Sequence, residues 1–237
     1  MTGIAPRAAA VDPAPLPDRP AHVLLRTSVD DLDAFSWAES YARRRGLGVV
    51  VGSGDPVTGS GAADVVVVNS RTDEDRALAL LVAASARCPV VAVPPGGTWR
   101  DDLPVLVGVR GDQPSEATLL SGFALARVLG AGLRAVCCTR EPLTSTPTVR
   151  AAASVVDRCA RRHPDVPVDT RVARSHPVTG LARHAGSASL LVLGCTSTTG
   201  SPTSRLLLDR CTRPVALIGP RVGSPGAADG TAVLPTA

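Results

Sequence analysis

The stretches Ala63-Asp-Val-Val-Val-Val-Asn69 and Ala188-Ser-Leu-Leu-Val-Leu-Gly194 share one pattern: a small residue, a polar residue and four apolar residues. They lie 125 residues apart, and at the same spacing Arg87-Cys-Pro-Val-Val-Ala-Val93 falls on Thr212-Arg-Pro-Val-Ala-Leu-Ile218. Short apolar runs of this kind are typical of parallel strands that are covered on both faces. The repetition predicts that the chain contains two related units.

A second spacing shows where the two units differ. At 84 residues, Arg26 falls on Arg110, and Tyr41-Ala-Arg-Arg-Arg-Gly-Leu-Gly48 falls on Leu125-Ala-Arg-Val-Leu-Gly-Ala-Gly132. The two spacings differ by 41 residues, so the first unit lacks a block that the second carries roughly between residues 139 and 185. We therefore predict five segments: a disordered lead (1–20), a truncated first unit (21–97), a linker (98–103), a complete second unit (104–221) and a loose tail (222–237).

The second unit alternates between predicted strands and helices. Helix-breaking Gly130-Ala-Gly132 ends its first helix, and Ser201 followed by Pro202 is typical of a helix start. Five strands with intervening helices predict a doubly wound parallel sheet. The expected strands are 105–109, 133–138, 168–173, 190–193 and 215–218. Two of the expected helices begin at residues 114 and 201, and the other two cover 149–162 and 178–184.

The first unit keeps fewer elements. Its expected strands are 23–26, 49–51, 65–68 and 90–93, and its expected helices are 31–44 and 73–86. Four strands and two helices make a thin fold, so we expect this unit to pack against the second.

Composition excludes several classes of function. All of the 25 cationic residues are Arg, so Lys-dependent phosphate loops and Schiff-base chemistry are excluded. A net charge of +4 and an aromatic content of 2% argue against a nucleic-acid partner. No apolar run approaches the ~20 residues that span a membrane, so we expect no membrane partner.

Cysteine usage and the first residues indicate the compartment. The 6 cysteines form no C-x-x-C pair and no cluster with His, so neither a metal site nor a disulfide framework is expected. Residues 1–20 contain no continuous apolar segment of the kind found in signal peptides. We therefore expect a reducing, cytoplasmic location.

The ordered motifs resemble those of the universal stress protein family. The resemblance rests on a helix that ends Gly-Ala-Gly, on Ser175-His-Pro177, on residues 189–194 and on the closing Arg-Pro-Val, and it covers roughly 22–95 and 104–220. It implies two adenine-nucleotide α-hydrolase-like α/β domains in tandem, the first truncated. It also implies a stress-response regulatory or binding protein rather than an enzyme.

Many members of that family bind ATP through a G-x2-G-x9-G-S/T motif after the fourth strand and an Asp after the first. Gly194 resembles the first glycine, and Gly200-Ser201 resembles the closing pair. Five residues separate Gly194 from Gly200, where the family pattern has twelve, and Arg110 stands in place of the Asp. An Arg cannot accept hydrogen bonds from a ribose or an adenine edge. The resemblance therefore implies a weakened or lost ATP site, with no cofactor assigned beyond ATP itself.

Two interpretations of the second unit stay open. In one, it still binds ATP, AMP or another anion, because hydroxyl residues and Arg110 would meet at the carboxyl edge of the sheet. In the other, the short loop merely caps a helix. The candidate binding residues are Val109, Arg110, Gly194, Thr196, Ser197, Gly200 and Ser201.

Other chemistry finds little support in the sequence. No G-x-S-x-G or G-x-G-x-x-G motif follows a strand, so we expect no catalytic residue and regard an enzyme of a related nucleotide-binding fold as the weakest alternative. The apolar closing strands, 90–93 and 215–218, favour self-association, either within the chain or as a homodimer. No protein partner is named by the sequence.

Overall fold

The computed structural model describes residues 22–26, 32–52, 60, 62–97, 100, 102–110, 116–139, 147–195 and 200–223. The first unit comprises β1 (His22–Arg26), α1 (Leu32–Arg45), β2 (Gly48–Val51), β3 (Ala63–Asn69), α3 (Asp73–Ser85) and β4 (Val90–Val93). The second comprises β5 (Val105–Val109), α4 (Glu116–Leu129), β6 (Leu133–Thr139), α5 (Pro147–Ala160), β7 (Val168–Arg174), α6 (Pro177–Ala185), β8 (Leu190–Gly194), α7 (Pro202–Arg210) and β9 (Val215–Ile218). Each strand and helix matches one that the sequence predicts.

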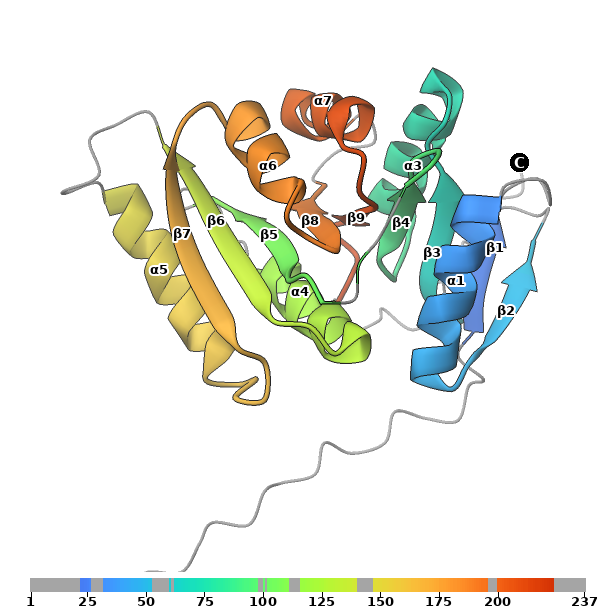
Figure 1. Cartoon of the computed structure of the whole chain (residues 1–237), viewed down its shortest axis with the longest axis horizontal. Coiled ribbons are helices and arrows are strands. Elements are labelled where there is room, and N and C mark those ends of the chain that lie inside the picture. Colours follow the sequence, from blue (N-terminus) through green and yellow to red (C-terminus); the bar gives the residue numbers. More distant parts are fainter. Residues whose placement is uncertain are drawn as a thin grey trace, which may run out of the picture.

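The strands of both units form one continuous sheet in the order β2-β1-β3-β4-β9-β8-β5-β6-β7 (Figure 1). Within each unit, neighbouring strands run parallel. The second unit carries α5, β7 and α6 between β6 and β8, whereas the first unit passes from β2 to β3 through residues 52–62. The fold is a doubly wound α/β sheet.

The two units meet through their closing strands. β4 and β9 run antiparallel, with Val90 opposite Leu217 and Ala92 opposite Val215. Both strands are fully buried, so these apolar runs pair with each other inside the chain. The outer edges of the described sheet are therefore β2 and β7. Formation of a homodimer stays a prediction. The closing strands β4 and β9 already pair with each other within the chain.

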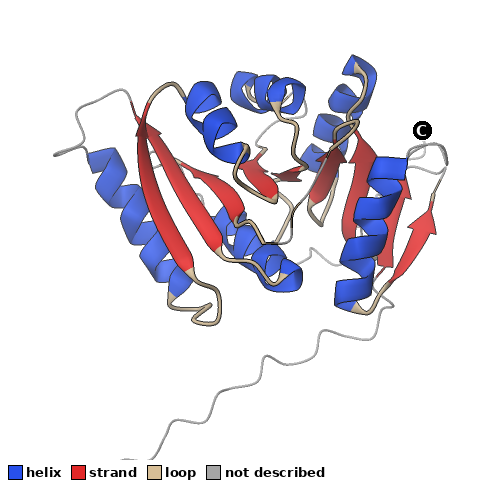
Figure 2. Cartoon of the chain, viewed as in Figure 1, coloured by secondary structure: helices blue, strands red, loops and turns tan. Residues whose placement is uncertain are grey.

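Helices cover both faces of the sheet, and each face spans both units (Figure 2). On one face α1, α4 and α5 bury residues such as Trp37, Phe123 and Val156 against alternate strand positions. On the other face α3, α6 and α7 bury residues such as Leu80, Leu181 and Leu207. Each core is thus continuous across the junction, which explains how a first unit with few elements of its own is stabilised.

Alternation along β6 separates the two adjacent cysteines. Cys137 lies in the core under α4 and α5, and Cys138 packs on the opposite face, as residues in a strand must. All six cysteines are free. None of the helices in the described ranges is long and apolar enough to cross a membrane.

Candidate functional site

A cavity of about 230 Å³ lies at the carboxyl ends of β5, β8 and β9 in the second unit. Its walls come from the ends of these strands, from β6 and from the first turns of α4, α6 and α7. In doubly wound sheets ligands bind at this edge, where the strand order reverses direction. The reversal falls between β5 and β8, since β6 and β7 continue on one side of β5 and β8 and β9 on the other.

Four of the seven predicted site residues line this cavity: Val109, Arg110, Gly194 and Ser201. Gly200 directly precedes Ser201, yet the Cβ of any other residue there would lie 2.6 Å from Leu80 Cδ2 of the first unit. Gly200 therefore contacts α3 rather than the cavity. Thr196 and Ser197 lie outside the described residues.

Ser201 forms the N-cap of α7, as the sequence predicts. Its Oγ accepts a hydrogen bond from the backbone N–H of Ser204 (3.1 Å) and lies 3.0 Å from Ser204 Oγ. Gly200 has φ of 67°, a backbone conformation that favours glycine, and Pro202 follows the cap. The loop thus turns sharply into the helix and presents hydroxyl groups at the cavity.

Gly194 allows β8 to end close to α4. A Cβ at this position would lie 2.9 Å from Thr118 Oγ1, and Thr118 is itself buried. The absence of a side chain at Gly194 therefore lets the end of β8 approach the start of α4 closely. Thr118 was not predicted as a site residue, because a Thr in the first turn of a helix carries no binding signature of its own.

Sequence reasoning also missed the wall formed by α6 and β6. Pro177, Leu181 and Cys138 line the cavity. The Ser175-His-Pro177 motif predicts only a helix start, and His176 is the N-cap of α6, with Nδ1 3.4 Å from the N–H of Val178. Nothing in the local sequence shows that this helix leans over the end of β5.

The described lining contains one charged side chain, Arg110, and no carboxylate. Arg110 is exposed at the end of β5. Burial raises the pKa of the Cys138 thiol to about 11, so this group is neutral at physiological pH. Among the described lining residues, Arg110 thus carries the only charge.

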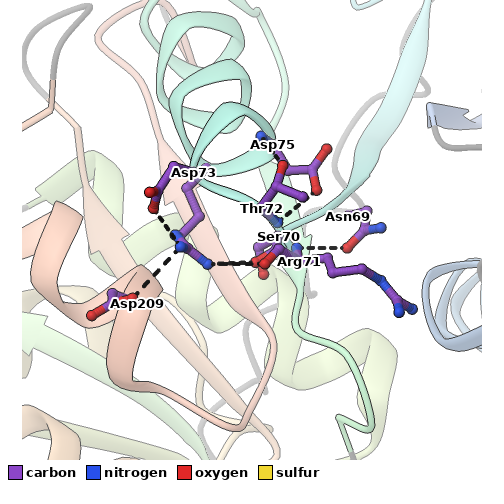
Figure 3. A network of polar contacts seen from close by, with 8 residues as sticks. Asn69, Ser70, Arg71, Thr72, Asp73, Asp75 and Asp209 are labelled. Carbon is purple, nitrogen blue, oxygen red and sulfur yellow. Dashed lines mark hydrogen bonds and ion pairs between the residues drawn. The ribbon is translucent and has the colours of Figure 1, made fainter.

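The corresponding place in the first unit is a polar network (Figure 3). Three residues, 70–72, separate β3 from α3, where seven residues, 195–201, separate β8 from α7. Arg76 Nη1 donates to the carbonyl oxygens of Ser70 (3.0 Å) and Arg71 (3.3 Å). Its Nη2 pairs with Asp73 and, across the junction, with Asp209 of α7. The side chain of Arg76 thus binds the loop that follows β3.

The same loop is fixed to the start of α3 by a capping box. Thr72 Oγ1 accepts from the N–H of Asp75, and the Asp75 carboxylate accepts from the N–H of Thr72. Asn69 Oδ1 accepts from the N–H of Arg71 (2.8 Å). Because these groups satisfy one another, the network resembles a structural closure more than a ligand site.

Clusters of polar side chains also occur elsewhere in the described part of the chain. No group of three or more His, Cys, Asp or Glu side chains in the described ranges could hold a metal ion. Tyr41 donates to Asp64 (2.6 Å), and Arg45 forms an ion pair with the same carboxylate. Burial raises the pKa of Tyr41, so its phenol stays protonated and can donate to Asp64. The Asp64 carboxylate thus accepts hydrogen bonds from both Tyr41 and Arg45.

Solved structures identify the fold as that of universal stress proteins. A universal stress protein from Archaeoglobus fulgidus is 16% identical, with 84% of this chain and 86% of that chain covered and a TM-score of 0.52. A putative universal stress protein from Pseudomonas aeruginosa is also 16% identical, with 84% and 82% covered and a TM-score of 0.50. Both matches extend over parts of both units, because neither unit alone makes up 84% of the chain.

A third structure with this fold comes from a different kind of protein. The cytoplasmic domain of a prokaryotic cation chloride cotransporter is 13% identical, with 83% of this chain and 94% of that chain covered and a TM-score of 0.53. No protein-family model matches the chain. No curated protein matches it either.

Proposed function

We propose that the chain is a regulatory protein of the universal stress type that binds a small molecule in the cavity of its second unit, and that it is not an enzyme. The observation that carries this proposal is the position of the cavity, at the carboxyl ends of β5 and β8 where the strand order reverses. Four residues chosen from sequence alone line it, which supports the same assignment.

The proposal includes a weakened affinity for ATP. Arg110 replaces the acceptor that would hold a ribose, and the cavity, at about 230 Å³, is smaller than the ~300–1,000 Å³ of typical ligand pockets. A nucleotide sensor of ordinary affinity is the second candidate. It is favoured by the hydroxyl groups of Ser201, Thr203 and Ser204 at the first turn of α7.

We also propose that the chain is a duplicated protein with a truncated first unit (21–97) and a complete second unit (104–221). The support is the shared strand order: β2-β1-β3-β4 repeats β6-β5-β8-β9, with β7 as an additional strand in the second unit. A role in the cytoplasm is part of the proposal, and the cytoplasmic cotransporter domain with a similar fold supports it.

Native mass spectrometry of the purified protein tests the binding function. We expect a non-covalently bound small molecule that is lost on mild activation and is absent from Ala117→Trp. Ala117 is exposed in the first turn of α4 and lines the cavity, so a large side chain there can fill the space without disturbing the core. Arg161→Ala, an exposed change in the turn directly after α5, is the matched control.

A thermal-unfolding titration with Mg-ATP tests the proposed weakened affinity for ATP. A ligand at 100 times its Kd adds about 2.7 kcal/mol to the free energy of unfolding, which is readily detected. We expect millimolar Mg-ATP to give far less. A large rise in Tm that Ala117→Trp abolishes would contradict weakened ATP binding and favour the nucleotide sensor.

A further inference from the structure

The lining of the cavity indicates which class of molecule it takes, provided that the cavity binds a ligand as proposed above. The hydroxyl-bearing residues of the described lining are Thr118, Ser201, Thr203 and Ser204. Ser201 and Ser204 hydrogen-bond to each other, and Thr203 is only half-buried at the start of α7. Thr118 differs from these three, because it is only 8% exposed and its Oγ1 forms no hydrogen bond with any described residue.

The position of Thr118 directs this hydroxyl toward the cavity. Thr118 lies in the first turn of α4, beside the end of β8, and a Cβ at Gly194 would lie 2.9 Å from its Oγ1. Gly194 is exposed and also lines the cavity, so the lack of a side chain there leaves Oγ1 open to a bound molecule. A buried polar group without a partner costs free energy, and a ligand that hydrogen-bonds with it recovers that cost.

Another part of the wall is apolar. Val136, Leu181, Leu193 and Ile218 contribute to it, and each is at most 5% exposed. Leu181 and Leu193 meet over β5, since a Cβ at Gly108 would lie 3.0 Å from Leu181 Cδ1 and 3.3 Å from Leu193 Cδ2. Burial of an apolar group against this wall is favourable in proportion to the area removed from water. At about 230 Å³ the cavity is smaller than the ~300–1,000 Å³ of typical ligand pockets, so the body must be compact.

The described lining offers no free charge to a ligand. It contains no Asp or Glu, and Arg110 is exposed and takes part in an interaction of its own. The starts of α6 and α7 are capped within the chain, by His176 at the N–H of Val178 and by Ser201 at the N–H of Ser204. A charge buried against apolar side chains without a partner is costly, so this lining favours a neutral molecule.

We propose that the natural ligand is a compact, neutral and mostly apolar molecule whose one hydroxyl or carbonyl group hydrogen-bonds with Thr118 Oγ1, while its body packs against Leu181, Leu193 and Ile218. A Thr hydroxyl both donates and accepts, so it can bind either group. The inference goes beyond the nucleotide ligands that the family resemblance implies. It makes Thr118 the residue that orients the ligand.

Methyl NMR titrations of Leu- and Val-labelled protein test this inference. The probes are phenol, toluene as the analogue of the same shape without a hydroxyl, benzamide, benzoate as the charged analogue of benzamide, and Mg-ATP. We expect phenol, toluene and benzamide to shift the methyl signals of Leu181 and Leu193. Benzoate should bind roughly tenfold or more weakly than benzamide, because its charge would be buried without a partner.

Variants isolate the hydrogen bond from the shape of the cavity. Thr118→Val keeps the shape and removes the hydroxyl, so it should raise the Kd for phenol roughly three- to tenfold and leave the Kd for toluene unchanged. Thr118→Ser, which keeps the hydroxyl, should bind phenol more tightly than Thr118→Val does. Thr179→Val, an exposed change in α6 outside the cavity lining, is the matched control and should alter neither Kd. Because Oγ1 has no partner among the described residues, Thr118→Val should not lower the Tm of the ligand-free protein.

Three outcomes would overturn the inference while small-molecule binding stands. One is a Thr118→Val variant that binds phenol normally, or that loses affinity for phenol and toluene alike. Another is a lower Tm of ligand-free Thr118→Val, which would assign the hydroxyl a structural role. The third is tighter binding of benzoate or Mg-ATP than of benzamide.

Absence of binding by every probe would overturn the inference as well. In that case native mass spectrometry still decides the proposed function, because it detects any co-purified molecule whatever its charge. If both experiments show an empty protein, small-molecule binding itself is wrong.

Discussion

The loops after β3 and after β8 occupy matching positions in the strand orders of the two units, but their surroundings differ. In the first unit three residues lead into α3, and Arg76 binds the carbonyl groups of Ser70 and Arg71 (Figure 3). In the second unit seven residues lead into α7, and the loop ends at a cavity. The two loops therefore differ in length and in the arginine that binds the loop of the first unit.

The wall opposite each loop differs as well. In the second unit α6 and β6 contribute Pro177, Leu181 and Cys138 to the cavity. Among its described residues the first unit has no counterpart of α6, so these residues supply no such wall there. The proposed role of the first unit is therefore to support the second through the shared sheet and cores.

The largest loss of stability should come from Gly219→Ala, which disrupts the packing of the second unit against α3 of the first. A Cβ at Gly219 would overlap the carbonyl oxygen of Ala83 in α3, and neither backbone can move cheaply. Overpacking of this kind typically costs about 1–3 kcal/mol, and we expect at least about 2 kcal/mol from urea denaturation. Gly186→Ala is the control, since its Cβ would meet only ordinary contacts at 3.7 Å.

The shape of that unfolding transition sharpens the comparison. Because both cores are continuous across the β4–β9 junction, Gly219→Ala should shift one cooperative transition to lower urea concentration. Two separate transitions, with only one displaced, would show that the units are independently stable and would contradict the supporting role of the first.

Gly200→Ala should have the next largest effect. The substitution places a side chain at φ of 67°, at a cost of roughly 1–2 kcal/mol. It also pushes against Leu80, 2.6 Å from the new Cβ. Gly46→Ala is a matched control, because its φ is 70° and no atom lies within 4 Å of the added Cβ.

The difference between these two variants isolates the contact between the cavity loop and α3. We expect Gly200→Ala to be about 1 kcal/mol more destabilising than Gly46→Ala in denaturant titrations. Leu80→Ala should then partly rescue Gly200→Ala in a double-mutant cycle. Equal losses in the two glycine variants would mean that the loop does not depend on the first unit.

Arg76→Ala should cost less, about 1–2 kcal/mol of unfolding free energy, because it removes hydrogen bonds from a charged donor that is largely buried. Its side chain is 21% exposed and binds the loop after β3. Arg100→Ala, which breaks an exposed pair with Asp102, should leave stability almost unchanged, because water screens this pair. If the two variants lost stability equally, the hydrogen bonds of Arg76 to the loop after β3 would not stabilise the fold.

The smallest effect concerns pH and the second unit. His163 stacks on Phe123 with ring centroids 4.8 Å apart, and its Nδ1 lies 3.1 Å from Arg127 Nη2. Burial first, and then the charge of Arg127, lower the pKa of His163, although Asp165 opposes this. The unfolded chain therefore binds the proton more readily, so the contribution of His163 is fully present above about pH 6.5 and is lost as pH falls below it.

Thermal unfolding between pH 7.5 and 5 measures this effect. We expect Tm to fall with pH, and His163→Phe to reduce the slope. His184→Gln should reduce it further, because burial and Arg134 also lower the pKa of His184. An unchanged slope in the double variant would show that these two histidines do not govern stability in this range.

Much of the fold could be predicted because its signals are local. Apolar runs such as 65–68 and 190–193 mark buried strands, and Ser201-Pro202 marks a helix start, whatever the distant surroundings are. The candidate site was predictable in part. Strand ends carry Val109, Arg110 and Gly194, and a topology rule places such ends at one edge.

The rest depended on contacts between segments far apart in the chain. Thr118, Leu181 and Cys138 reach the cavity only because α4, α6 and β6 pack around the ends of β5 and β8. Gly200 looked like part of a phosphate-binding motif, but its lack of a Cβ makes room for Leu80 of the other unit. Such residues have no local pattern that distinguishes packing from binding.

The sequence by itself determined the elements and their order, because periodicity and caps act over a few residues, and its repeats led to the prediction of two unequal units. The tertiary structure showed that β4 and β9 join both units into one sheet, since the apolar side chains of these strands favour pairing but do not specify whether the partner strand belongs to the same chain. It also decided that one loop borders a cavity and the other closes on Arg76, because enclosure depends on α6, which the second unit possesses and the described part of the first does not.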